Sequence, residues 1–107
     1  MAEIPAWLLP HTVTVETYAG ASGLGDRHEA PQVVDRVRVD HTRRLVRDEN
    51  GDEVVSEATV YARTVRAPLF TPGTRVDLGS RVALVIAANV RTDGGAGGWQ
   101  HVEVTLT

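Results

Sequence analysis

Cysteine is absent from the 107 residues of this chain, and lysine is absent too, so all eleven basic residues are arginine. Without cysteine the chain can form no disulfide, no thiolate metal site and no cysteine nucleophile. Aromatic residues make up only 5% of the chain, so the core must be built mainly from Val, Leu, Ile and Ala. Arginine is then the cation available to pair with carboxylates, which its planar guanidinium suits well.

Long apolar runs and a basic charge balance are also missing. No stretch approaches the ~20 apolar residues of a membrane-spanning helix. The first residues, MAEIPAWLLPH, lack the basic start of a signal peptide. We therefore expect a soluble protein, made in a cytoplasm, without membrane contact. The net charge of −3 argues against a general nucleic-acid-binding surface, which needs clustered cations.

The chain does contain Val-rich segments of alternating polarity, separated by Gly and Pro. Its length and its 42% of hydrophobic residues predict one domain over residues 1–107, with one core. In the N-terminal arm, residues 1–10, Pro5 and Pro10 leave room for one helical turn at most, and no other helix is predicted. About six short strands predict an all-β fold, a small β-barrel of the SH3-like or OB-like kind. Trp7 and Leu8 are expected to anchor the arm on the barrel or on a neighbouring molecule.

Alternation along each predicted strand indicates which residues share a face. The predicted strands are 11–18, 32–47, 53–65, 74–78, 81–91 and 99–107. The residues expected to share a face, strand by strand, are Val13 and Val15; Val33, Val37, Val39 and Leu45; Val54, Ala58, Val60 and Ala62; Val82, Leu84, Ile86, Ala88 and Val90, with Val85 and Ala87 opposite; and Val102, Val104 and Leu106.

Residues 43–57 predict a hairpin whose tip is almost entirely charged. Asn50-Gly51 indicates a type I′ turn, in which both central residues need a positive φ. A charged tip does not pack in the chain's own core, so the hairpin is expected to project, and its mixed charges suit pairing between identical copies. The expected interaction residues are Arg43, Arg44, Arg47, Asp48, Glu49, Asn50, Gly51, Asp52, Glu53 and Glu57. The register that follows pairs Val39 with Ala62, His41 with Val60, Leu45 with Ser56 and Arg44 with Glu57.

Two further segments are predicted to be glycine-rich loops, residues 19–31 and residues 93–98. Loops beyond ~12 residues are uncommon in small domains and are usually functional or disordered. Between the strands, Thr71-Pro72-Gly73 predicts a type II turn. Because binding residues concentrate on loops, function is expected on these loops and on the charged hairpin.

No motif for catalysis, a metal or a cofactor is found. The glycine-rich residues 20–25 lack the GK[ST] of a phosphate-binding loop, and the acidic tip does not match the EF-hand pattern. The serines lie outside any GxSxG elbow. We therefore predict no enzyme, no cofactor and no metal site. The four histidines lack zinc-site spacing and are expected to be surface or cross-strand residues, with His41 the most buried of them: His11, His28, His41 and His101.

The order of the segments resembles a known family. LLPHTVTVE is followed by a Gly-rich loop with a late Pro, a long strand into RRLVRDENGDEVVSEATVY, then TPGTRVDLG and a final pair of Val-rich strands. Residues 46–61 match the pattern V-x-D-x-x-G-x-E-V-x-S-x-A-T-V-Y. The chain is similar, over nearly its whole length, to head-closure proteins (head-to-tail stoppers) of long-tailed bacteriophages, especially those of actinobacterial phages and prophages.

The resemblance implies a β-barrel that assembles in the host bacterial cytoplasm into a ring, usually of twelve copies, in the neck of the virion. Portal and adaptor proteins would lie above the ring and a tail terminator or tail-completion protein below it, with DNA passing through without specific binding. Residues 43–57 would line or gate the channel. Loop 19–31 would contact a neighbouring subunit or ring, through residues Gly23, Leu24, Gly25, Asp26, Arg27 and His28.

Two alternatives stay open. A tail-terminator or tail-completion ring would occupy a nearby place in the virion, although such proteins carry helices against their sheet. A small barrel that binds a peptide or an oligonucleotide is the alternative from another class. The acidic charge balance and the scarcity of aromatic residues weigh against nucleic acid, because stacking platforms for bases are missing.

Overall fold

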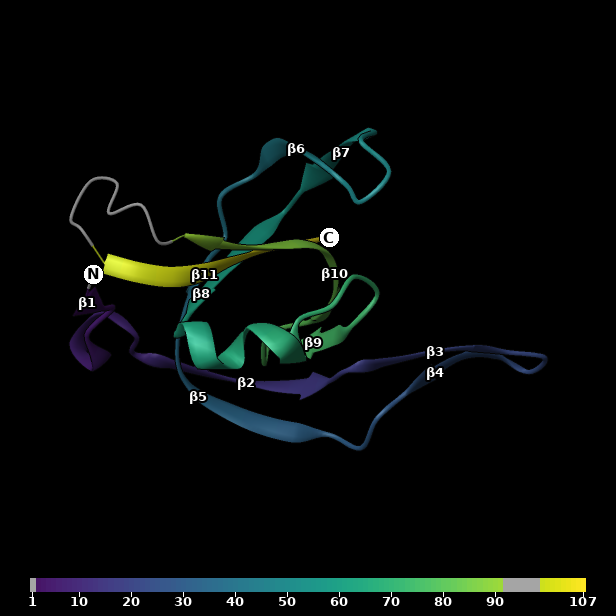
Figure 1. Ribbon diagram of the computed structural model, residues 1–107, viewed down its shortest axis with the longest axis horizontal. Helices are drawn as coiled ribbons and strands as arrows, with labels where there is room; N and C mark the ends of the chain where they lie inside the picture. The colour runs from purple at the N-terminus through teal and green to yellow at the C-terminus, as the bar shows by residue number, and fades with distance from the viewer. Residues whose placement is uncertain (1, 92–98) are drawn as a thin grey trace.

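The computed structural model describes residues 2–91 and 99–107 (Figure 1). The predicted loop 93–98 lies outside these residues. Two short 3₁₀ helices are present, η1 (Ala6–Leu8) and η2 (Thr64–Leu69), and no helix among the described residues is long and apolar enough to cross a membrane. The strands are β1 (Ala2–Glu3), β2 (His11–Glu16), β3 (Tyr18–Ser22), β4 (Gly25–His28), β5 (Gln32–Asp40), β6 (Arg44–Arg47), β7 (Glu53–Ser56), β8 (Ala58–Ala62), β9 (Arg75–Asp77), β10 (Val82–Arg91) and β11 (Trp99–Leu106).

Six strands form a closed ring of hydrogen-bonded neighbours. Their order is β11-β10-β9-β2-β5-β8, and β8 pairs again with β11. All of these pairs are antiparallel, whereas the short β1 adds to β11 in parallel. The structure therefore confirms the predicted all-β class. Because the ring is closed, each of its six strands is hydrogen-bonded to a neighbouring strand on both sides.

The hydrophobic core lies inside the six-stranded ring. The predicted inward faces of β2, β8 and β11 are confirmed, because their alternate residues are all buried. Phe70, the single phenylalanine, follows η2 and is completely buried as well. The buried residues of these three strands are Val13, Val15, Ala58, Val60, Ala62, Val102, Val104 and Leu106.

The predicted face of the strand 32–47 is right for Val37 and Val39 but wrong for Val33, because β5 contains an irregularity. Arg36 has a positive φ of 59°, and the pairing of β5 with β2 shifts by one residue near it. A bulge of this kind changes which residues point inward. Val34 and Val37 are therefore both buried, whereas Val33 is 68% exposed.

β10 also departs from its predicted faces. Its pairing with β11 shifts between Val85 and Ala87, so a single alternation does not run through the strand. Ala83 and Val85 are buried, and Val82, Leu84 and Val90 are exposed. Apolar residues occupy both faces of this strand, and periodicity cannot choose between them.

The N-terminal arm contains one helical turn, η1, within the limit that was predicted, and of its two expected anchors Leu8 is half-buried. Trp7 is 75% exposed and does not fasten the arm to this chain, whereas Ile4 and Leu9 are buried. Glu3 provides a second attachment, because its carboxylate accepts hydrogen bonds from the Thr64 backbone N–H at 2.6 Å and the Thr64 hydroxyl at 2.9 Å. β1 thus lies against the start of η2.

η2 is a helix that the residue pattern does not predict. Its six residues are too few to show a helical period, and Pro68 lies within it. The turn that follows is confirmed as type II: Gly73 has φ 88°, and the Thr74 N–H donates to the Thr71 carbonyl at 3.0 Å.

Candidate interaction surfaces on two hairpins

Within the described part of the chain, two hairpins lie outside the six-stranded ring, β3–β4 and β6–β7 (Figure 1). The molecule measures 45 × 30 × 24 Å, and β3–β4 extends along its longest direction. Among the described side chains, no buried hydrophobic residue belongs to either hairpin. Ordering a chain segment costs conformational entropy, which these hairpins do not recover by burying apolar side chains in the core. They are therefore the first places to look for contacts with other molecules.

The tip of the β6–β7 hairpin is organised by Asp48. The Asp48 carboxylate accepts hydrogen bonds from the backbone N–H groups of Asn50, at 2.9 Å, and Asp52, at 3.0 Å. The Asp48 N–H donates to the Asp52 carbonyl at 3.0 Å, so three residues form the loop. A positive φ occurs at Gly51 (82°) but not at Asn50. The predicted type I′ turn is thus wrong, because the chain uses a three-residue loop that ends in glycine.

The longer loop also changes the predicted register. Arg44 lies opposite Ser56 and Leu45 lies opposite Val55, one residue away from the expected pairs. In the pairing of β5 with β8 the register differs by two residues from the predicted one, because Val39 lies opposite Val60 and not opposite Ala62. The predicted continuous hairpin is in fact two separate ladders, β6–β7 and β5–β8, because the chain between β5 and β6 leaves the sheet.

Ser56 and Glu57 mark the place where β7 leaves the six-stranded ring. The buried Ser56 hydroxyl lies 2.9 Å from the carbonyls of Ala58 and Leu106, and the Glu57 N–H donates to the Leu106 carbonyl at 3.0 Å. These bonds join the base of the hairpin to the end of β11. The hairpin therefore projects from a defined attachment.

The two faces of the β6–β7 hairpin differ. Val46 and Val54 are half-buried on the face toward the six-stranded ring, and the exposed Arg44 lies on the same face. Leu45, expected to point inward, is 67% exposed on the outer face. The predicted pair between Arg44 and Glu57 does not form. Glu57 instead lies 3.4 Å from Arg43, and Arg47 lies 3.6 Å from Glu53.

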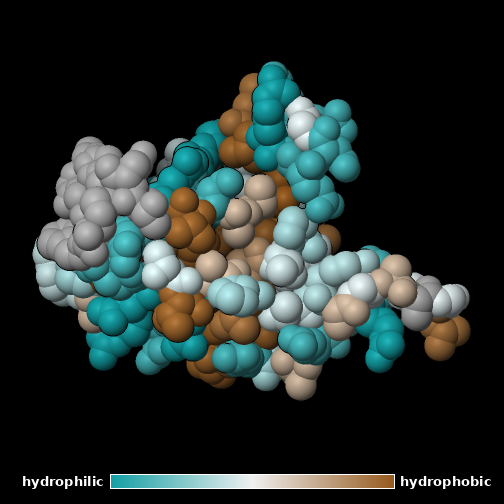
Figure 2. Space-filling model, in the orientation of Figure 1, coloured by the Kyte–Doolittle hydropathy of each residue, from teal (hydrophilic) through white to brown (hydrophobic). Residues whose placement is uncertain are grey.

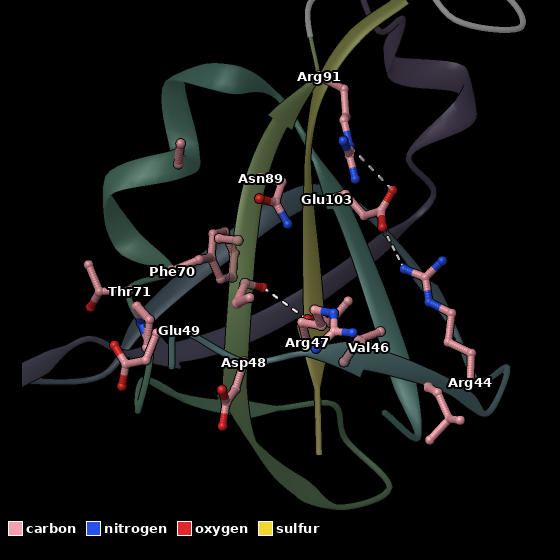
Figure 3. Close-up of a pocket in the computed structure, with 16 residues that line it drawn as sticks. Arg44, Val46, Arg47, Asp48, Glu49, Phe70, Thr71, Asn89, Arg91 and Glu103 are labelled. Carbon is pink, nitrogen blue, oxygen red and sulfur yellow. Dashed lines mark hydrogen bonds and ion pairs between the residues drawn. The ribbon is translucent and has the colours of Figure 1, made fainter. Parts of the chain in front are cut away.

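A groove of about 750 Å³ lies beneath the hairpin, between β6, β10, β11 and the end of η2 (Figure 3). Glu103 of β11 lies between two arginines in this view: its carboxylate is 2.5 Å from Arg44 and 3.9 Å from Arg91. Glu103 and Arg91 were not singled out from the sequence, since single charges on predicted strands carry no positional signal. Phe70, Thr71 and Asn89 line the same groove.

The charges of this groove affect Tyr61, which lies opposite Glu103 in the pairing of β8 with β11. Burial raises the pKa of the Tyr61 hydroxyl, and the Glu103 carboxylate raises it further, whereas Arg44 opposes both effects. Tyr61 therefore remains neutral at physiological pH. The groove therefore combines charges that are already paired with apolar lining residues such as Val46 and Ala88.

The histidines lie apart, as expected for cross-strand and surface residues. His11 accepts a hydrogen bond from the Val39 N–H at 3.0 Å, and His28 lies 3.0 Å from the Gly73 carbonyl. His101 packs its ring against Tyr61. His41, expected to be the most buried, is exposed. Within residues 2–91 and 99–107, no group of three His, Asp or Glu residues is arranged to hold a metal ion.

The predicted flexible loop 19–31 is instead largely the β3–β4 hairpin. Alanine and glycine predominate in β3, so alternation gave no strand signal. Gly20 and Gly25 have φ above 100°, where glycine is favoured over other residues. Gly23 and Leu24 form the turn, and the Leu24 side chain is completely exposed. Figure 2 shows hydrophobic atoms at the far end of this projection.

The root of β3–β4 is tied to the type II turn 71–74. The Tyr18 N–H donates to the Thr74 hydroxyl at 3.0 Å, and the Tyr18 ring packs edge-on against His28. The Tyr18 hydroxyl lies 3.3 Å from the Asp26 carboxylate. Burial raises the pKa of Tyr18, and the carboxylates of Asp26 and Glu49 add to the increase.

The two sets of predicted interaction residues therefore come from separate projections. The tips differ in chemistry: β6–β7 ends in carboxylates around Asn50-Gly51, whereas β3–β4 ends in Leu24. Asp48 and Glu49 line a hollow with Pro72 and Gly73, so the β6–β7 tip reaches the turn that holds the root of β3–β4. Comparison of the chain with protein-family models, curated proteins and solved structures finds no match.

Proposed function

We propose that this protein is a structural subunit of a ring at the junction between the head and the tail of a long-tailed bacteriophage. The observation that carries the proposal is the pair of hairpins that project from a closed six-stranded ring without adding to its hydrophobic core. This arrangement suits a subunit whose projections contact other subunits. The similarity of the segment order to head-closure proteins supplies the location.

In this proposal the β3–β4 hairpin contacts a neighbouring subunit or an adjacent ring. A two-stranded sheet has little stability of its own, and its edges are open to further pairing. The completely exposed Leu24 places an apolar group at its end. Burial of a leucine side chain contributes about 1.5–3 kcal/mol, so docking of this tip would help to hold subunits together.

The β6–β7 hairpin is proposed to line or gate the DNA channel. Its tip, residues 47–53, contains one arginine and four carboxylates. A surface of the same sign as the phosphate backbone lowers non-specific affinity for DNA, which favours passage through the channel. The partners would be portal and adaptor proteins on one side and a tail-terminator or tail-completion protein on the other, around a ring of about twelve copies by analogy with head-closure proteins.

The test is electron microscopy of phage particles made without this protein, followed by addition of the purified protein. The proposal predicts leaking or DNA-filled heads beside separate complete tails, and joined particles after addition. Normally joined particles in the absence of the protein would refute it. Peptide and oligonucleotide binding to the purified domain would then be the next measurement.

A further inference from the structure

The outer face of the β6–β7 hairpin carries an ordered pattern of side chains, none of which is buried in the core. An ion pair, an apolar pair and a second ion pair follow one another along it. Within the hairpin, Arg47 also donates to the Gly51 carbonyl at 2.6 Å. Leu45 is 67% exposed and Val55 is 39% exposed. Exposed ion pairs contribute little to the stability of a chain. The outer face consists of Arg43 with Glu57, Leu45 opposite Val55, and Arg47 with Glu53.

The charges on this face are sorted by strand. Arg43, just before β6, and Arg47, in β6, form an arginine column on one side of the hairpin. Glu53, in β7, and Glu57, just after β7, form a glutamate column on the other side. The columns run side by side because β6 and β7 are paired directly. A surface with positive charge along one side and negative charge along the other can be complementary to itself.

We propose that the outer face of β6–β7 binds the same face of a second copy of this chain, through a two-fold axis parallel to the strands. Such a rotation exchanges left and right but keeps the position along the strands. Each residue then faces, on the second copy, the residue that lies opposite it within its own hairpin. The three contacts, each made twice, are Arg43 with the partner's Glu57, Leu45 with the partner's Val55, and Arg47 with the partner's Glu53.

The charge pattern selects this axis over the other two-fold axis that brings the faces together. An axis across the strands would put Arg43 against the partner's Arg47 and Glu57 against the partner's Glu53. Like charges in contact are repelled, so that orientation is disfavoured. The orientation of the contact is therefore a prediction that can be tested separately from its existence.

The contact is small, since six residues from each copy are far fewer than the roughly 20–30 per side of a standard stable interface. We expect weak association of isolated chains and a larger effect where several copies are held together, because linked contacts reinforce one another. Neighbours in one ring of about twelve are related by rotation about the ring axis, so this two-fold contact joins copies that do not adjoin in the same ring, and the inference goes beyond the proposed function without resting on it. The pairing itself is tested with purified protein.

The first experiment separates the charges onto two chains. One variant, R43E/R47E, carries only acidic residues at the four charged positions; the other, E53R/E57R, carries only basic ones. Sedimentation of the wild type at low salt should show concentration-dependent dimers that dissociate as salt is added. Each variant alone should stay monomeric, and an equal mixture should associate at least as strongly as the wild type.

The second experiment determines the axis by cross-linking. The chain contains no cysteine, so an introduced cysteine is the only thiol. Oxidation of a mixture of the Leu45→Cys and Val55→Cys variants should give mostly the mixed disulfide, because the proposed axis brings these two positions together. A matched control uses Val33→Cys, an exposed valine on β5, in place of Val55→Cys, and should give only random disulfides.

The pairing is overturned if the mixed charge variants stay monomeric with both chains folded by circular dichroism. It is also overturned if Leu45→Cys forms disulfides with itself as readily as with Val55→Cys. Neither outcome bears on whether particles lacking the protein fail to join heads to tails, so this inference and the proposed function can fail independently.

Discussion

Glu3 links the N-terminal arm to η2 through a carboxylate that accepts three hydrogen bonds, two from Thr64 and one from Gln100. Burial alone would raise the pKa of this carboxyl group. The hydrogen bonds from Thr64 and Gln100, together with the charge of Arg63, outweigh burial and hold the pKa below its ordinary value of 4.5. The folded state therefore favours the charged form.

Replacing Glu3 with Gln should make stability less dependent on pH. A lowered pKa in the folded state gives stability that is present above the ordinary value and is lost as pH falls through the folded value. At about pH 7 the loss in E3Q should be about 1–2 kcal/mol, the scale of hydrogen bonds to a charged group at a partly exposed site. The measurement is urea unfolding at about pH 7 and about pH 3. A difference between wild type and E3Q that does not shrink at the lower pH would contradict this account.

Gly73 has two reasons to be glycine. Its φ is 88°, and a Cβ atom there would lie 3.3 Å from the Tyr18 ring. Gly79 has a similar φ of 89°, but a Cβ atom there would meet no atom within 4 Å. The two positions therefore share a backbone conformation that would strain an alanine, and they differ in steric contact.

Gly73→Ala should destabilise the protein more than Gly79→Ala. We expect a cost of about 1–3 kcal/mol from the positive φ in both variants, with an additional loss at position 73 where Tyr18 must move. Urea unfolding of the two variants measures the difference. Equal losses would mean that the Tyr18 ring yields without cost.

At the scale of elements, the β6–β7 hairpin depends on its own tip and on a few contacts with the six-stranded ring. Asp48 closes the tip, and Arg44 connects the hairpin to Glu103. The hairpin buries little of its surface, so we expect it to open more readily than β8 or β11. The hairpin is therefore held in its conformation mainly by these few contacts.

Asp48→Ala should loosen the hairpin without unfolding the domain. Loss of the two hydrogen bonds to the Asp48 side chain should cost about 1–2 kcal/mol of local stability. Hydrogen exchange of residues 44–56 should accelerate, while exchange in β8 and β11 stays unchanged. Asp52→Ala, which removes the same charge nearby, serves as the control, and equal acceleration in both variants would refute the specific role of Asp48.

Leu24→Ser tests the β3–β4 hairpin as a contact between subunits. The side chain is completely exposed, so unfolding in urea should change by no more than about 0.5 kcal/mol. Incorporation of the variant into particles should fall several-fold under the proposed function, because an apolar contact is lost. Val33→Ser, at another exposed apolar residue, is the matched comparison; incorporation of L24S at the wild-type level would exclude Leu24 from the interface.

At the scale of the whole molecule, negative charge is distributed unevenly. The net charge is only −3, but carboxylates gather at the β6–β7 tip. The variant E49Q/D52N/E53Q removes three of them and keeps Asp48, which holds the loop together. We expect folded protein that still joins heads to tails but delivers DNA less efficiently, because DNA binds the neutral tip more strongly. Unchanged infectivity would argue strongly against a role of the tip in the channel.

The sequence by itself determined the all-β class and the buried faces of β2, β8 and β11, because in these strands alternation continues without interruption. It also determined that residues 43–57 turn back at Asn50-Gly51 and that 71–74 is a type II turn, since these depend on local backbone preferences. The charged tip was correctly expected to lie outside the core.

Only the tertiary structure decided the rest. The bulges in β5 and β10 reverse the faces of Val33 and Val82, and a bulge depends on how neighbouring strands fit together rather than on periodicity. Arg44 pairs with Glu103, 59 residues away, instead of with Glu57, because a one-residue change in the loop turned it toward β11. The β3–β4 hairpin was hidden because alanine and glycine give no alternation. Register and the choice between two apolar faces depend on long-range partners, and this is why local pattern could not settle them.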